Sequence, residues 1–184
     1  VNDGTVSIGG ASNTAVQFVN FSSLTGGDNV TDSFTVTGEI STIDGGASSS
    51  AANQNSLTGR AEASRYDLTG AFAGDVQTAA DDVYVGTFSN IHELVGNSTA
   101  DELVARPQDN TWTIAATNTV SQTLETPTDT LTFSGFNVLT GNSGEDQFNI
   151  SSSFLGTMNG GAENDFFTIE DVSITVSQIN GQGG

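Results

Sequence analysis

Short segments in which apolar and polar residues alternate occur along the whole chain. In most of them a polar residue, usually threonine, stands between two apolar residues. This period of two is typical of a β-strand that buries one of its faces. The clearest segments are Phe34–Val36, Val83–Val85, Trp112–Ile114, Leu131–Phe133, Phe148–Ile150, Phe167–Ile169 and Ile174–Val176. Segments that favour a helix are few and short, so we predict an all-β chain of many short strands.

A longer motif occurs three times and begins at Phe18, Phe88 and Phe133. In each copy the first, fourth and seventh residues are apolar and the ninth is glycine. An aspartate follows the glycine, and two apolar residues at alternate positions follow the aspartate. The three aspartates are Asp32, Asp101 and Asp146. Similarity over this length indicates an architecture of stacked repeats.

Equivalent apolar positions recur every 19 to 24 residues, as from Leu24 to Ile43 and from Leu139 to Met158. One turn of a β-helix needs about this length, and turns must stack because none can bury its apolar side chains alone. We therefore predict a right-handed parallel β-helix (β-solenoid) of about eight coils of 19–24 residues. An antiparallel β-sandwich is the alternative, although its strands are usually longer.

Stacked coils should place equivalent side chains above one another. The predicted columns are Phe18, Phe88 and Phe133; Phe21, Ile91 and Phe136; and Leu24, Ile43, Leu94, Leu139 and Met158. We expect residues 1–184 to form a single solenoid segment of a longer or processed chain. Residues 48–65 are almost free of large apolar residues, so we expect an irregular coil or a protruding loop there.

Composition excludes several classes of function. The chain has 22 acidic residues, three arginines, no lysine and no cysteine, and its formal net charge is −19. Such a surface repels nucleic-acid phosphates and anionic lipids, so we expect no nucleic-acid binding. The chain has no run of 18 apolar residues, so we expect no membrane insertion either. Without lysine there is no P-loop or Schiff base, and without cysteine there is no disulfide scaffold or zinc ribbon.

The repeat units resemble the β-strand repeats of giant secreted bacterial surface proteins of the filamentous-haemagglutinin-like and repeat-containing adhesin type. The resemblance rests on residues 18–36, 112–150 and 158–169. It implies an exported structural or adhesive shaft without enzymatic chemistry, located outside the cell or on its surface, with a surface or glycan as ligand. Unpaired strand edges at the end coils add homotypic end-to-end contacts, or contacts with other parts of the same fibre.

Two glycine-rich turns resemble degraded copies of the calcium β-roll repeat. They are Gly141–Phe148 and Gly160–Phe167, and Asp146 and Asp165 are their candidate calcium ligands. In that family the ion lies between stacked turns and is bound by carboxylate and backbone oxygens, as calcium requires. In the alternative interpretation, glycine forms the bend and aspartate caps the turn without an ion. The first alternative function is therefore a calcium-binding repeat module.

The second alternative function is a polysaccharide-acting β-helix enzyme. Two carboxylates at a suitable distance can hydrolyse a glycosidic bond, but among 22 acidic residues some pairs must lie close by chance. His92 is the only histidine, and its place in the motif is polar in the other copies, so we expect it on the surface. We predict no catalytic residue, no enzyme, and no cofactor other than calcium.

Overall fold

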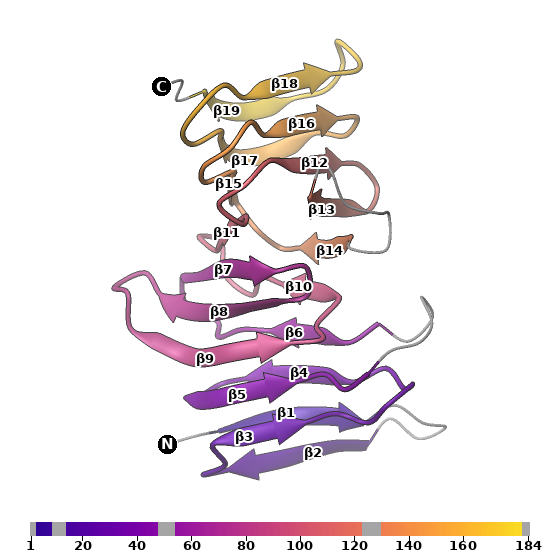
Figure 1. Ribbon diagram of the computed structural model, residues 1–184, viewed down its shortest axis with the longest axis vertical. Coiled ribbons are helices and arrows are strands. Elements are labelled where there is room, and N and C mark those ends of the chain that lie inside the picture. Colours follow the sequence, from indigo (N-terminus) through magenta and orange to yellow (C-terminus); the bar gives the residue numbers. More distant parts are fainter. Residues whose placement is uncertain (1–2, 9–13, 48–53, 123–129, 182–184) are drawn as a thin grey trace.

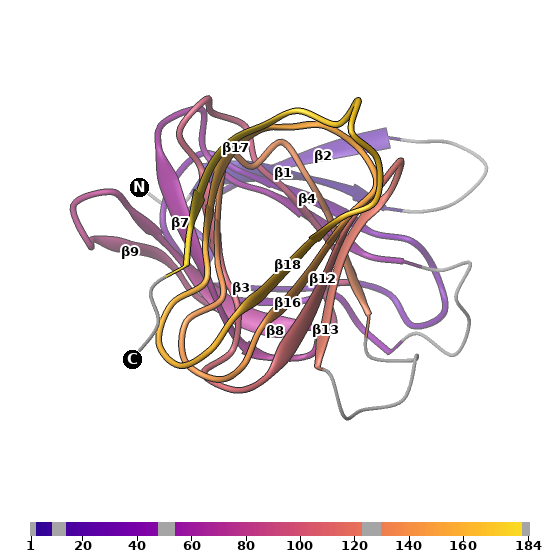
Figure 2. The same ribbon diagram turned by 90° about the horizontal axis from the view of Figure 1, so that it is seen from above.

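The computed structural model describes residues 3–8, 14–47, 54–122 and 130–181. It is all-β, as predicted, and the strands form two large, mostly parallel sheets that lie along the long axis (Figure 1). Seen along that axis, successive strands lie around a common interior (Figure 2). This arrangement is consistent with a β-solenoid-like architecture. Among the described residues there is no helix of the length and hydropathy needed to cross a membrane.

The larger sheet, called sheet A, has ten strands. From the N-terminal end of the stack they are β2 (Thr14–Val19), β1 (Asp3–Ile8), β4 (Ser33–Val36), β6 (Ser56–Thr58), β10 (Glu93–Val95), β14 (Leu131–Ser134), β13 (Asn118–Gln122), β12 (Asn110–Ile114), β16 (Gln147–Ile150) and β18 (Phe166–Ile169). The smaller sheet, sheet B, has nine strands. In the same direction they are β3 (Ser23–Thr25), β5 (Ile40–Asp44), β9 (Val83–Ser89), β8 (Ala73–Thr78), β7 (Ser64–Gly70), β11 (Glu102–Val104), β15 (Val138–Thr140), β17 (Phe154–Asn159) and β19 (Val176–Asn180).

Three strands run against the direction of the others. β1 and β13 in sheet A and β8 in sheet B are each antiparallel to both of their neighbours. The remaining neighbouring pairs are parallel. Without these three strands, each sheet has eight strands of one direction in the part of the chain that is described.

Two meanders reverse the order of the chain within the stack. The strands β7, β8 and β9 step back toward the N-terminal end, and so do β12, β13 and β14. As a result β9 lies beside β5, and Phe88 pairs with Ile43, 45 residues earlier. Where no meander intervenes, partners lie closer in sequence, and Leu24 pairs with Ile43 at 19 residues. The predicted period therefore holds only where the chain winds without a meander.

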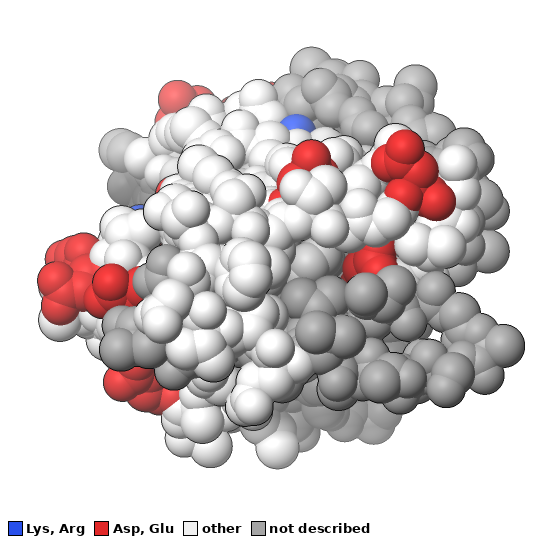
Figure 3. Space-filling view, turned by 90° about the horizontal axis from the view of Figure 1, so that it is seen from below, with Lys and Arg blue, Asp and Glu red and all other residues white. Residues whose placement is uncertain are grey.

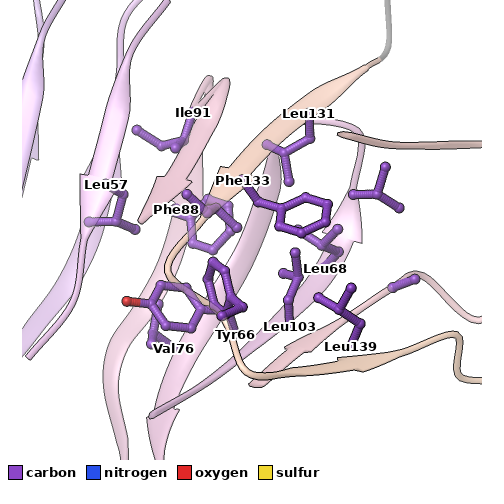
Figure 4. Packing of buried hydrophobic residues seen from close by; sticks show 14 of the residues in the cluster. Leu57, Tyr66, Leu68, Val76, Phe88, Ile91, Leu103, Leu131, Phe133 and Leu139 are labelled. Atoms are coloured by element: carbon purple, nitrogen blue, oxygen red, sulfur yellow. The ribbon is translucent and has the colours of Figure 1, made fainter. Parts of the chain in front are cut away.

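One hydrophobic cluster fills the space between the sheets (Figure 4). Strand registers arrange its side chains in columns. These are Phe34, Leu57, Leu94 and Phe133 in sheet A, and Tyr66, Leu103, Leu139 and Met158 in sheet B. Further along sheet A, the ring of Phe148 stacks on Trp112 at 5.4 Å and on Phe167 at 4.6 Å between centroids. Such stacked contacts add to the free energy gained by burying the rings.

The structure corrects the predicted columns. Phe18 and Phe133 belong to sheet A, but Phe88 belongs to sheet B. In the same way Leu94 lies in sheet A, whereas its predicted partners lie in sheet B. Phe21 is 55% exposed rather than part of the core. The predicted neighbours Leu24 with Ile43 and Leu139 with Met158 are confirmed.

The reason for this error is that the repeated motif forms a corner between the sheets. In each copy the first residue lies near the end of one strand, and the seventh lies in a strand of the other sheet. The third residue has a positive φ, 63° at Asn20, 55° at Asn90 and 77° at Gly135. Asparagine and glycine adopt this left-handed conformation at the lowest cost. A corner from sheet A to sheet B needs the same residues as one from sheet B to sheet A, so the motif does not reveal which sheet the chain enters.

Part of the segment predicted as an irregular coil or protruding loop, 48–65, belongs to sheet A. Residues 48–53 lie outside the described residues. Ser56–Thr58 form β6, which pairs with β4 and β10, and Leu57 is fully buried. A single leucine between two polar residues is enough to form a strand here, because Leu57 packs between Phe34 and Leu94 of the neighbouring strands.

Candidate functional site

Asp146 and Asp165, the candidate calcium ligands, lie in neighbouring turns that lead into β16 and β18. The backbone N–H of Asp146 donates a hydrogen bond to Oδ1 of Asp165 at 3.1 Å. Oδ1 of Asp146 accepts hydrogen bonds from the backbone N–H of Asn110 at 2.8 Å and from its Nδ2 at 2.9 Å. The structure therefore brings the two candidates together in one column, with Asn110 as its third member.

Glycine stands before each of these aspartates for a steric reason. A Cβ atom on Gly141 would clash with Oδ2 of Asp146, and one on Gly160 would clash with Oδ2 of Asp165. Only glycine leaves room for the carboxyl group to fold back over the chain. A Cβ atom on Gly26 would likewise clash with Oδ2 of Asp32, whereas one on Gly96 would clash with the backbone of Gly135. The spacing of glycine and aspartate in the motif thus reflects a packing requirement.

Burial raises the pKa of both candidate carboxyl groups. The side chain of Asp146 is fully buried, and desolvation raises its pKa to about 7. Hydrogen bonds from Asn110 oppose this rise, and the charge of Asp165 adds to it. Burial likewise raises the pKa of Asp165. Oδ2 of each carboxyl group is buried without a hydrogen-bond partner, and retention of a proton lowers the cost of burying it.

Two carboxyl groups do not by themselves make a calcium site. Calcium takes six to eight oxygen ligands. Within the described ranges there is no group of three or more Asp, Glu, His or Cys side chains that could hold a metal ion. Further ligands would have to be backbone oxygens, so calcium binding by Asp146 and Asp165 stays a prediction.

Similar hydrogen bonds connect turns elsewhere in the stack. The backbone N–H of Asp32 donates to Oδ1 of Asn55 at 2.9 Å, and that of Ser64 donates to Oδ1 of Asp101 at 2.8 Å. Oδ2 of Asp32 also accepts a hydrogen bond from the backbone N–H of Gly27 in its own turn. These aspartates cap turns and link each turn to the next one.

Sequence analysis does not single out Asn55 or Asn110, although both are fully buried members of these columns. Each stands two residues before a buried residue of sheet A, Leu57 or Trp112, just as Asp146 stands before Phe148. A search for Asp or Asn at this spacing would have found them. They were missed because neither belongs to a full copy of the motif.

His92 lies half-buried, which corrects its predicted place on the surface. Its ring packs against Phe72 with 4.4 Å between centroids. Its Nδ1 accepts a long hydrogen bond, 3.4 Å, from the backbone N–H of Asn55. Burial lowers the pKa of the imidazole, which favours the neutral ring that this acceptor role requires. The side chain therefore has a structural role in the column of Asp32 and Asn55.

An open cleft of about 820 Å³ lies beside the turn between β8 and β9. Glu39, Glu62 and Asp82 line it together with Arg60. Nη1 of Arg60 lies 3.1 Å from Oε1 of Glu62, and its guanidinium carbon lies 4.2 Å from the centre of the Tyr84 ring. Sugar hydrolysis needs two carboxylates on either side of the bond that is cut. The cleft offers three carboxylates, and one of them, Glu62, is paired with Arg60.

The apolar columns end uncovered at the C-terminal end of the stack. Ile150 of β16 is fully buried, but its partner Ile169 of β18 is 47% exposed. Met158 of β17 is fully buried, but its partner Ile179 of β19 is 36% exposed. In the described residues, β18 and β19 each pair with a single strand. Within residues 130–181, each sheet therefore ends in a strand with one unpaired edge beside a partly exposed apolar side chain.

Comparisons with known proteins give no match to a family model, a curated protein or a solved structure.

Proposed function

We propose that this chain is a segment of a right-handed parallel β-solenoid, with a structural or adhesive role in an exported bacterial surface protein or extracellular filament. The observation that carries the proposal is the pair of sheets with eight strands of one direction each, which agrees with the expected number of coils. One hydrophobic cluster fills the interior, so no coil is independent of its neighbours. Repeats that contact only their neighbours are suited to extended shafts.

Stiffness along such a shaft would come from hydrogen bonds between coils. Backbone pairing in both sheets runs along the stack, and the column of Asn110, Asp146 and Asp165 adds bonds between turns. The net charge of −19 would keep neighbouring shafts apart, because like-charged surfaces repel side by side. The proposed mechanism is therefore mechanical, with cohesion along the axis and repulsion across it.

Stretching the chain between its two ends is expected to unravel it in steps. A coil of 19–24 residues would release about 70 Å of chain, at about 3.4 Å for each residue. Larger steps are expected for the meanders β7–β9 and β12–β14, because each adds two strands to a turn. Single-molecule force spectroscopy measures these steps. Release of the whole chain in a single event would count against a shaft of stacked coils.

Calcium binding is a second candidate function, favoured by the buried, unpartnered Oδ2 atoms of Asp146 and Asp165. If an ion binds between these turns, millimolar calcium should raise the melting temperature and give a calorimetric signal, because a ligand of the folded state stabilises it. The double variant Asp146→Asn, Asp165→Asn should lose both effects. The absence of any shift in the parent protein at millimolar calcium rejects the site.

A further inference from the structure

Asn55, just before β6, is bonded to turns that lie far from it in the sequence. The side chain is fully buried. Its Oδ1 accepts a hydrogen bond from the backbone N–H of Asp32 at 2.9 Å. Its Nδ2 donates to the backbone oxygens of Gly45 at 2.7 Å and of Asn90 at 3.1 Å. One asparagine therefore holds three separate turns of the stack together.

His92 binds the backbone of Asn55 and also contacts the β7–β9 meander. Its Nδ1 accepts a hydrogen bond from the N–H of Asn55 at 3.4 Å, and its own N–H donates to the Asn55 oxygen at 2.8 Å. The ring packs against Phe72, in the turn between β7 and β8, with 4.4 Å between centroids. Beside it, the N–H of Ile91 donates to the backbone oxygen of Phe72 at 3.1 Å. His92 thus joins the meander to Asn55.

Only a neutral imidazole can accept the hydrogen bond from Asn55. A proton on Nδ1 turns this atom into a donor that faces another donor, so the N–H of a fully buried residue loses its partner. It also places a charge on a half-buried ring. Burial lowers the pKa of His92, because the charged form is harder to desolvate than the neutral one.

Neighbouring carboxylates do not offset this effect of burial. The contact partners Asn55, Phe72 and Thr132 are uncharged. Titratable groups close by are Glu93, the next residue of the chain, and Asp32, whose backbone binds Asn55. Neither contributes to the lowered pKa of His92, which burial alone causes. Seen from the N-terminal end of the stack, acidic side chains lie in separate groups among uncharged ones (Figure 3).

We propose that His92 is an acid-sensitive latch between Asn55 and the β7–β9 meander, which opens when the imidazole takes up a proton. The open state binds this proton more readily than the closed state. Opening is therefore favoured by up to about tenfold for each pH unit below 6.5, until the ring of the closed state is protonated too. The latch is a property of the fold and does not depend on the proposed role of the shaft.

The test must be local, because the raised pKa of Asp146 has the opposite effect on the stability of the whole chain. Amide hydrogen exchange by NMR at pH 7.5 and pH 5.5, corrected for intrinsic rates, reports each site separately. In the parent, the protection factors of Asn55 and Ile91 should fall by up to about tenfold at pH 5.5, and those of β17 should not fall.

His92→Asn is the matched variant, because the asparagine Oδ1 can accept a hydrogen bond in place of Nδ1 and does not titrate. It should lose the pH dependence at Asn55 and Ile91. Glu93→Gln removes the adjacent carboxylate but leaves the latch, so it should keep that dependence.

Three results would overturn the latch. One is equal protection of Asn55 in the parent at both pH values, and another is the same pH dependence in His92→Asn as in the parent. The third is loss of the dependence in Glu93→Gln, which would assign it to Glu93. NMR titration of the ring carbons of His92 in the parent needs no variant. A midpoint below 6.5 supports the latch, and a midpoint at or above 6.5 contradicts it.

Discussion

Phe136→Asp is expected to abolish cooperative folding at 25 °C. The ring of Phe136 is buried, with its edge against Tyr66 at 4.9 Å and near Phe133 at 6.2 Å. An aspartate here would bury a charge without a partner, and it would also remove the aromatic contact that joins this corner to Tyr66 of β7. Together these losses are expected to cost about 5 kcal/mol or more, comparable to the whole stability of a typical domain.

The measurement is urea unfolding followed by the fluorescence of Trp112, the only tryptophan, which is fully buried. Phe136→Leu keeps an apolar side chain and should cost less than Phe136→Asp, because it buries no charge. Phe21→Asp is the matched control, because Phe21 occupies the same position of the motif but is exposed. An unfolding midpoint of Phe136→Asp equal to that of Phe21→Asp would mean that the described core register is wrong.

Asp146→Asn is expected to stabilise the protein at pH 8 and to reduce its pH dependence. The pKa of Asp146 is about 7 in the folded state and 3.8 without the protein environment. Between these values the unfolded chain releases a proton that the folded chain keeps, so stability falls as pH rises from about 4 to 7. Over about three pH units the loss reaches at most about 4 kcal/mol. Asparagine carries no charge and can still accept the hydrogen bonds from Asn110.

Melting temperatures of the parent and the variant at pH 5 and pH 8 test this prediction. The parent should melt lower at pH 8 than at pH 5, and Asp146→Asn should lose most of that difference. Asp171→Asn is the control, since Asp171 is exposed and hydrogen bonds from Ser173 lower its pKa. Removal of this charge should leave the slope between pH 5 and pH 8 unchanged. The idea fails if the parent and Asp146→Asn show the same slope.

Six of the seven alternating segments lie within strands of the structure because local alternation is strong, whereas the seventh, Ile174–Val176, contributes only Val176 to β19. Trp112 and Phe148 each stand between polar residues, Phe167 is followed by Thr168, and the structure places the three in neighbouring strands with stacked rings. The link between Asp146 and Asp165 could also be predicted, because these turns are 19 residues apart and no meander separates them. Pairings within one simple turn are local enough for a repeat period to reveal.

The pairing of Ile43 with Phe88 could not be predicted in the same way. It depends on the reversal at β7, β8 and β9, which places β9 beside β5 and β7 beside β11. The alternating pattern of an antiparallel insertion such as β8 is the same as that of any other half-buried strand. The buried caps Asn55 and Asn110 were missed for a related reason, since their partners lie in turns that are distant in sequence.

The sequence by itself determined the all-β fold and most of the inward-facing residues, because these follow from local alternation. Only the tertiary structure decided the order of the strands in the stack and the sheet to which each copy of the motif belongs. The physical reason is that strands of both sheets need the same alternating pattern. Turns from sheet A to sheet B also need the same residues as turns from sheet B to sheet A. Which sheet a strand joins depends on which strand edge is still unpaired when the chain comes back to the stack.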